Sequence, residues 1–230
     1  MAWRWKEWGI LVGGGLLTVA CAQTSYGPYG KNSDPLNPLE RSIEFEVTDA
    51  FYTDPPRCAV VLPFKGTGIG DARPEVVETS LARQLSVRLD RVVGPRERER
   101  LARDLAVSLA HESGRRQFAR GARCPFLVEA TPWGEGSVFA VVWTQERVGL
   151  EAHMIRARDG ALIWKARHIA TRSEGGLPLS PFSAVFNALT VGYFKSDADV
   201  PNSLIEDATR RIAETLPDTR TYGLAARRTQ

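Results

Sequence analysis

The sequence predicts an α/β fold, a single three-layer-like sandwich in which helices flank one mixed sheet. From residue 58 to residue 130, short apolar runs alternate with amphipathic segments, an order typical of parallel strands joined by right-handed crossovers. From residue 137 to residue 171, strand-like stretches follow one another without a helix, which indicates an antiparallel meander. We therefore expect parallel first strands and antiparallel later strands in the same sheet.

Local patterns predict the elements of the first half. The β-branched apolar run at 58–64 indicates a buried strand. Residues 74–91 predict a helix, because the segment opens on a proline and carries apolar residues at a spacing of four. Next we expect a strand at 92–93, a charged helix at 96–110, a short helix after Gly114 and a strand at 126–130. We interpret the alternating charges at 96–100 as a solvated helix face.

The second half is predicted to hold strands at 137–146, 147–157 and 161–171, then a helix at 181–194. Ser203 and Glu206 form a capping box that opens a last helix, which ends at Pro217.

The register of the last hairpin follows from side-chain alternation. A three-residue loop, Arg158-Asp159-Gly160, places Met154 opposite Trp164. One face of the hairpin is then apolar, with Val148, Leu150, Ala152, Met154, Leu162, Trp164 and Ala166. The other face carries Glu151, His153, Lys165 and Arg167. A two-residue loop would mix apolar and charged residues on both faces, so we prefer the longer loop.

This register argues against the one metal triad that the sequence offers, because it separates His153 from His168. We expect no metal and no cofactor, since no HExxH or CxxC pattern is present. The glycine-rich stretch Gly66–Asp71 follows a strand but lacks a phosphate-loop pattern, so we interpret it as a turn. No nucleophile–histidine arrangement stands out either, and we expect no catalytic residue and no enzyme.

The N-terminus predicts export. Arg4 and Lys6 precede an eleven-residue apolar stretch, Ile10–Ala20. It is too short to span a bilayer, which takes about 20 residues, but it fits the apolar region of a signal peptide. The stretch closes on Leu17-Thr18-Val19-Ala20-Cys21, which resembles the bacterial lipobox. An ordinary signal peptide, cut after Ala20 or Ala22, is the simpler alternative.

The lipobox resemblance implies a signal peptide at 1–20 and a lipid anchor on Cys21. Ala22 follows the cysteine, and the absence of aspartate there favours the outer membrane, facing the periplasm. The five prolines between residues 21 and 56 predict an extended tether, although the alternation at 43–47 allows a short strand. We expect a folded domain at 57–216 and a polar, basic tail at 217–230.

Cys58 and Cys124 each precede a predicted strand. If the two strands are parallel neighbours, the sulfur atoms meet and the oxidising periplasm favours a disulfide. If another strand lies between them, both thiols stay free.

Several segments resemble the superfamily of periplasmic lipoproteins around the TolB amino-terminal domain. They are Ala59–Phe64, Glu75–Leu89, Ala119–Glu129, Val148–Ile155, and Asp159-Gly160 with Leu162–Trp164. The superfamily includes the curli-secretion lipoprotein CsgG and the lipoprotein activators of penicillin-binding proteins. The resemblance implies the same α/β sandwich and a non-enzymatic role in envelope assembly or secretion. Residues 137–171 do not supply the two long membrane hairpins of a CsgG-like pore, so we expect a soluble domain.

The composition fits these expectations. Hydrophobic residues make up 43% and charged residues 25%, which excludes wholesale disorder, and a net charge of +3 is too small for a dedicated nucleic-acid binder. We expect a non-enzymatic envelope lipoprotein that binds a protein partner in envelope assembly or maintenance. The alternatives are a subunit of an oligomeric secretion or surface-polymer assembly, and a domain that binds a small ligand or nucleotide.

Overall fold

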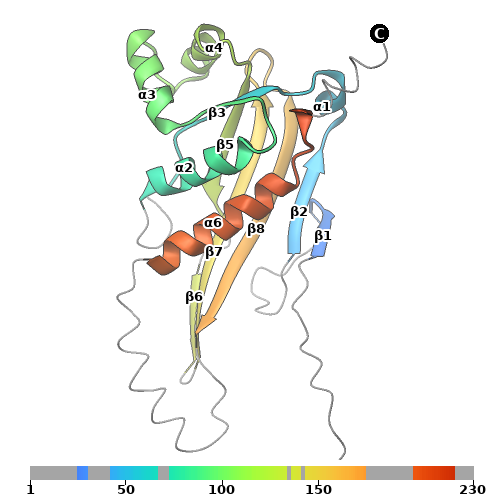
Figure 1. Cartoon of the computed structure of the whole chain (residues 1–230), viewed down its shortest axis with the longest axis vertical. Helices are drawn as coiled ribbons and strands as arrows, with labels where there is room; N and C mark the ends of the chain where they lie inside the picture. The colour runs from blue at the N-terminus through green and yellow to red at the C-terminus, as the bar shows by residue number, and fades with distance from the viewer. Residues whose placement is uncertain are drawn as a thin grey trace, which may run out of the picture.

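The computed structural model describes residues 25–30, 42–66, 73–133, 136–140, 143–174 and 199–220. Within them, an eight-stranded sheet has the order β1-β2-β8-β7-β5-β3-β4, with β6 paired to β7 (Figure 1). The strands are β1 (Ser25–Pro28), β2 (Ser42–Val47), β3 (Cys58–Val61), β4 (Arg91–Val93), β5 (Phe126–Pro132), β6 (Gly136–Ala140), β7 (Trp143–Arg156) and β8 (Leu162–Glu174). The helices are α1 (Asp49–Thr53), α2 (Pro74–Leu85), α3 (Pro95–Asp104), α4 (Glu112–Gly121) and α6 (Asp199–Glu214).

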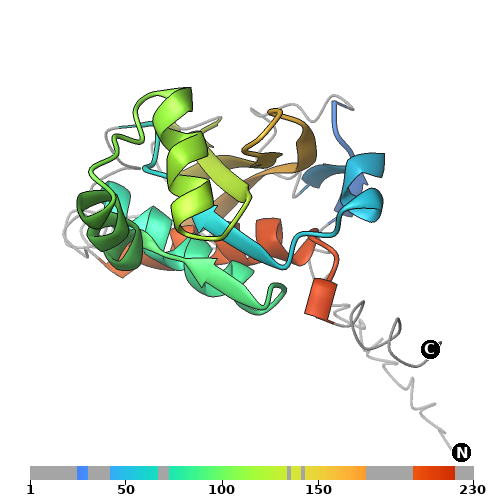
Figure 2. The ribbon, with the colours of Figure 1, turned by 90° about the horizontal axis from the view of Figure 1, so that it is seen from above.

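The predicted fold class is confirmed. Strand β3 pairs in parallel with both β4 and β5, and the later pairs β5–β7, β7–β8 and β8–β2 are antiparallel. Alternate residues of β3 and β5 supply two separate cores. Val61 and Val128 pack with α2 and α6 on one side, whereas Val60 and Leu127 pack with α3 and α4 on the other. Figure 2 shows α4 on one side of the sheet and α2 and α6 on the opposite side.

The predicted register of the β7–β8 hairpin is confirmed over most of its length. Met154 faces Trp164, Ala152 faces Ala166, and Glu151 faces Arg167. The three-residue loop is wrong by one residue. Arg156 N–H donates to the Ala161 carbonyl at 2.9 Å, so residues 157–160 form the loop, and the register shifts between Met154 and Ile155.

This shift changes one core residue. Ile163, rather than Leu162, joins the buried cluster beside Trp164. Gly160 has a φ of 71°, the left-handed conformation that glycine adopts without steric cost.

The predicted boundary between strands at 146 and 147 is also wrong. Strand β7 is continuous from Trp143 to Arg156, and its first residues pair with β6 on one side and with β8 on the other. The polar residues 145–147 therefore lie inside a strand instead of in a turn.

The predicted tether at 21–56 is wrong for the residues that the structure describes there, because the fold begins well before residue 57. Strand β2 lies between β1 and β8, and the side chains of Ile43 and Phe51 are fully buried. The strand foreseen at 43–47 is thus an integral part of the sheet. The described prolines fit this arrangement, since Pro28 ends the edge strand β1 and Pro55 and Pro56 follow α1.

The helix predicted at 96–110 is too long because α3 ends on an unusual residue, and the helix predicted after Gly114 already begins at Glu112. Helix α3 stops at Asp104, where Ala106 has a φ of 50° and Val107 N–H donates to the Ala102 carbonyl at 3.0 Å. Helix α4 ends in the same way, with Arg123 at a φ of 51° and Cys124 N–H bonded to the Ala119 carbonyl. This is the Schellman pattern, which usually uses glycine.

The remaining helices also differ from their predicted limits. Helix α2 ends at Leu85, although Leu89 in the following turn is still buried. Helix α6 already begins at Asp199, so Ser203 is not its cap. Proline at position 201 is tolerated because the first helical turn has no partner for its backbone N–H. The helix predicted at 181–194 lies outside the described residues. The fold also continues past the predicted end at 216, because buried Thr219 donates its N–H to the Arg88 carbonyl.

The interpretation of residues 96–100 as a solvated face is wrong for Arg98, which is buried. Its guanidinium donates to the Val61 carbonyl and to a carboxylate oxygen of Glu78, both at 2.8 Å. The second oxygen of Glu78 accepts the Phe64 N–H at 2.9 Å. The pair joins α2 and α3 to the end of β3.

We expect Arg98→Ala to lower the free energy of unfolding by about 3–5 kcal/mol, because it strands the buried carboxylate of Glu78. The double variant Glu78→Gln with Arg98→Met should lose clearly less, since no charge then stays unpaired. Urea unfolding followed by circular dichroism measures both. Arg100→Ala, an exposed arginine of the same helix, is the matched control, and an equal loss there would contradict the prediction.

Candidate functional site

Among the residues that the structure describes, helices cover only part of one sheet face. Helices α3 and α4 pack over β3 and the start of β5, while the rest of that face carries polar residues across four strands. Register places them in two rows that run across β5, β7, β8 and β2. The first row is Glu129, His153, Lys165 and Glu46, and the second is Thr131, Glu151, Arg167 and Glu44. We call these two rows, with Tyr29, Lys65, Arg115 and Trp133 beside them, the charged face.

Glu129 is the centre of the first row. Its side chain is only 6% exposed, and its carboxylate accepts hydrogen bonds from Lys65 and from Arg115 of α4. His153, its cross-strand neighbour, brings Nε2 to 3.2 Å from the carboxylate. Hydrogen bonding from His153, helped by Lys65, lowers the pKa of Glu129 to about 2, although burial opposes this shift.

Arg167 is the centre of the second row. Its Nε and Nη2 donate to one oxygen of buried Glu44, at 3.0 and 2.7 Å. The same oxygen accepts the Gly30 N–H at 2.8 Å. The guanidinium lies over two aromatic rings, 4.4 Å from the centroid of Trp133 and 4.7 Å from that of Tyr29. Such cation–π contacts fix the direction of the arginine side chain.

Tyr29 also binds the neighbouring row, because Lys165 Nζ lies 4.0 Å from its ring centroid. Burial and a hydrogen bond with Glu151 raise the pKa of Tyr29 to about 12. Its hydroxyl therefore stays protonated at neutral pH and serves as a hydrogen-bond donor.

The charged face places buried carboxylates beneath more exposed cations. The carboxylates of Glu44 and Glu129 are buried beneath the cations, whereas the side chains of Lys65 and Lys165 are 52% and 25% exposed. Glu46, which pairs with Lys165 at 3.0 Å, is the more exposed carboxylate. Because a general acid or base needs a pKa near the working pH, Glu129 is a poor candidate for that role.

The residues considered for a metal site are not brought together. His153 lies on the charged face, whereas His168 lies on the opposite face of the sheet. His168 directs Nδ1 at the Ser42 carbonyl, 3.1 Å away. Among the described residues, no group of three His, Cys, Asp or Glu side chains is arranged to hold a metal ion. Most of the Gly66–Asp71 turn and the whole N-terminal region with Cys21 lie outside the described residues.

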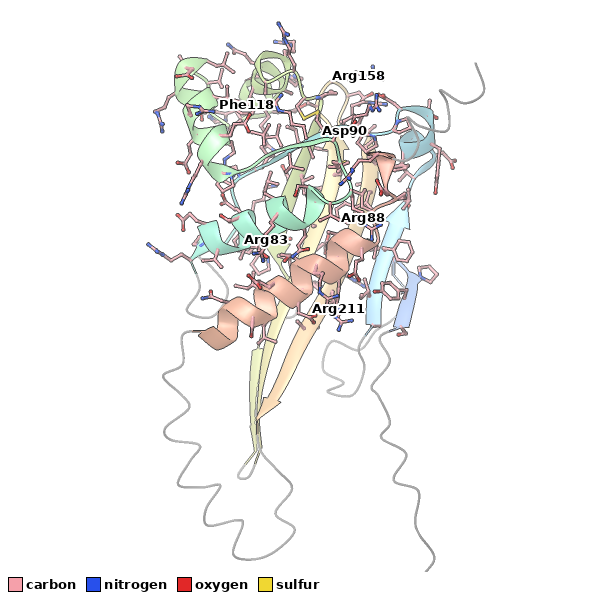
Figure 3. All side chains as sticks on the ribbon, viewed as in Figure 1. Arg83, Arg88, Asp90, Phe118, Arg158 and Arg211 are labelled. Atoms are coloured by element: carbon pink, nitrogen blue, oxygen red, sulfur yellow. A yellow bond between two sulfur atoms is a disulfide. The ribbon has the colours of Figure 1, made fainter. Side chains whose placement is uncertain are left out.

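The two remaining cysteines are joined. Strands β3 and β5 are parallel neighbours, and the Cα atoms of Cys58 and Cys124 are 5.7 Å apart, with the sulfur atoms bonded as a disulfide (Figure 3). Cys124 and Phe118 belong to the same buried cluster under α4. The disulfide therefore ties β3 and β5 together at the end where both strands begin.

Sequence reasoning identified only part of the charged face. The hairpin register predicted that Glu151, His153, Lys165 and Arg167 share one side, and the structure agrees. It did not identify Glu129, Lys65, Arg115 or Glu44. A single carboxylate inside the apolar strand 126–130 was the available signal, because a charge in such a strand needs a partner when it is buried.

Acid should weaken the folded state through Glu129. Its folded-state pKa of about 2 lies below its usual value of 4.5, so its ionised form stabilises the fold above about pH 4.5, and this contribution disappears as pH falls toward 2. Glu129→Gln should flatten this part of the stability profile, measured by urea unfolding at pH 2.5, 4 and 6. Glu206→Gln, an exposed carboxylate on α6, is the control. An unchanged acid dependence in Glu129→Gln would contradict the assignment.

Removing the disulfide should also cost stability. The bond joins residues 66 positions apart, and the chain-entropy model gives about 4 kcal/mol for a loop of this size. We expect Cys58→Ser with Cys124→Ser to lose about 2–4 kcal/mol. Alkylation of the unfolded protein, followed by mass spectrometry, should label neither cysteine until a reductant is added; labelling of both without reductant would refute the bond.

Comparisons with known proteins give fold likeness only. No family model matches the sequence, and no curated protein matches it. Among solved structures, the chain is similar to the PelC dodecamer from Paraburkholderia phytofirmans, with 14% identity, 75% of this chain and 98% of that chain covered, and a TM-score of 0.38.

Two further solved structures are similar. Lipoprotein GNA1162 from Neisseria meningitidis has 11% identity, covers 62% of this chain and 100% of its own, and gives a TM-score of 0.43. The LpoB C-terminal domain from Salmonella enterica has 14% identity, with 55% of this chain and 90% of that chain covered, and a TM-score of 0.32. These neighbours include bacterial lipoproteins, but with TM-scores below 0.5 the likeness carries no argument about what this chain does.

Proposed function

We propose that the chain is a non-enzymatic bacterial envelope lipoprotein whose charged face binds a protein partner in envelope assembly or maintenance. In this proposal Cys21 carries the lipid anchor, and the domain faces the periplasm from the outer membrane. The lipobox-like sequence Leu17–Cys21 supports the anchor. The proposal for the domain rests on one observation, the layered charges on the part of the sheet that no described helix covers.

The layering of charge favours binding over catalysis. Buried Glu44 and Glu129 are held by arginine, lysine and histidine side chains, so they act as fixed counter-charges. The cations above them reach solvent and are already oriented by these contacts and by the aromatic rings. A partner therefore meets groups that have little side-chain freedom left to lose on binding.

The exposed ends of Lys65 and Lys165 indicate the chemistry of the partner. A protein segment rich in aspartate and glutamate would place carboxylates against these ammonium groups and against Arg167. Trp133 and Tyr29 beside the arginine add flat apolar surface of the kind that protein interfaces use. We therefore propose an acidic segment of another envelope protein as the occupant.

Crosslinking through Lys65 and Lys165 tests whether the charged face binds an acidic partner. Carbodiimide joins amines to carboxylates in contact, so treatment of intact envelopes should link Lys65 or Lys165 to an Asp or Glu of one other protein. Lys31 and Lys195, the only other lysines after residue 21, should link to it much less. Mass spectrometry of the crosslinked peptides identifies both ends.

Variants then decide whether the face is responsible. Lys65→Ala with Lys165→Ala should lose the crosslinked partner and weaken its co-purification at least about tenfold, which corresponds to 1.4 kcal/mol. The matched control, Arg83→Ala with Arg211→Ala, removes two cations from α2 and α6 on the opposite side (Figure 3). Equal capture by both variants would refute the proposed face. Crosslinks between two copies of this chain would refute a separate partner protein and would show that the face binds a second copy of the chain.

A further inference from the structure

At the end of the sheet where β1 starts, the strands do not all end at the same level. Register places Ser25 beside Ser42, and the next residue, Ile43, lies beside His168, which lies beside Leu150. The first residue of β1 is therefore level with the middle of β7. Strand β7 begins at Trp143, about six residues further out, which is about 20 Å at 3.3 Å per residue.

The overhanging strands extend in the direction from which β1 starts. Strands β1 and β2 are parallel, β2 is antiparallel to β8, and β8 is antiparallel to β7. The starts of β1 and β7 and the ends of β6 and β8 therefore lie at the same end of the sheet. Figure 1 shows β6, β7 and β8 extending past the lower ends of β1 and β2.

The length of this overhang can be compared with the distance from the sheet to the proposed lipid anchor. The inference therefore rests on the proposed lipidation of Cys21. Cys21 lies four residues before Ser25. Even a fully extended chain of that length spans only about 14 Å. Because the overhang measures about 20 Å, the end of β6 and β7 reaches at least as far as the anchor when the strands point toward the bilayer.

The overhanging end has the composition of a membrane contact. Val138, Phe139 and Ala140 end β6, and Ala140 pairs with Trp143 at the start of β7. Tryptophan and other aromatic residues are enriched at the level of lipid headgroups, where an apolar body and a polar N–H are both satisfied.

We infer that the paired ends of β6 and β7 form a second membrane contact, which inserts into the interfacial region of the phospholipid bilayer that holds the acyl chains of Cys21. The acyl chains keep the protein at the membrane, and the strand ends fix its orientation. The sheet then stands on the bilayer, with its strands along the membrane normal. The charged face, a side of the same sheet, is thereby turned parallel to the normal, where a partner in the periplasm reaches it.

Tryptophan fluorescence tests the contact directly. After residue 21 the chain has Trp133, Trp143 and Trp164, of which Trp164 is fully buried. The lipidated protein is reconstituted into dioleoylphosphatidylcholine vesicles with or without brominated phosphatidylcholine, which quenches indoles within the bilayer. Wild type should be quenched, Trp143→Phe should lose most of that quenching, and the control Trp133→Phe should keep it.

A second variant keeps the test valid if Trp143→Phe fails to fold. Phe139→Asp introduces a charge at the same end and should shift the Trp143 emission to longer wavelength in vesicles, while circular dichroism stays unchanged. The mass of the N-terminal peptide reports acylation of Cys21 separately. An unacylated Cys21 would overturn the anchor itself. An acylated, vesicle-bound protein whose Trp143 is not quenched would overturn the membrane contact alone, and would leave the apolar end for a protein partner.

Discussion

The alternation of side chains along β7 and β8 is the constraint on which the rest of the structure depends. Even-numbered residues from Val148 to Met154 face one side and pack on α2 and α6, whereas Glu151 and His153 face the other. The same alternation passes through register to β5 and β2, so four strands share one apolar and one polar face. A slip of one residue would bury Arg167 and expose Trp164, which makes this register the best-determined feature of the sheet.

Sequence reasoning succeeds where a rule is local. The β7–β8 pairing, the helix that begins at Pro74 and the strand at 43–47 each follow from a periodicity or a turn within about twenty residues. It fails where the deciding contact is distant or uses an unusual residue. Nothing near Ile43 indicates that it pairs with His168, and neither Ala106 nor Arg123 indicates the left-handed conformation that ends its helix. The site was incomplete for the first reason, because Glu129 gains its partners from three separate segments.

Buried charges hold the layers in place at two points. Glu78 and Arg98 join α2 and α3 at the end of β3, and Glu129 joins α4 to β5 through Arg115. Such pairs contribute little net stability compared with apolar residues of equal size, but they are costly to break singly. Their effect is to specify one arrangement, since each carboxylate finds its full set of donors only when the helices have the observed register on the sheet.

The N-terminal strand would link the proposed anchor on Cys21 to the charged face. The Tyr29 ring contacts Lys165 and Arg167, the Gly30 N–H binds Glu44, and the Tyr29 N–H binds the Phe45 carbonyl at 3.1 Å. The segment that follows Cys21 in the sequence therefore completes the second row. A force that pulls β1 from the edge of the sheet would remove a ring from two cations and a donor from a buried carboxylate. Strand β1 holds only four residues on one neighbour, and an anchor on Cys21 would act on this strand first.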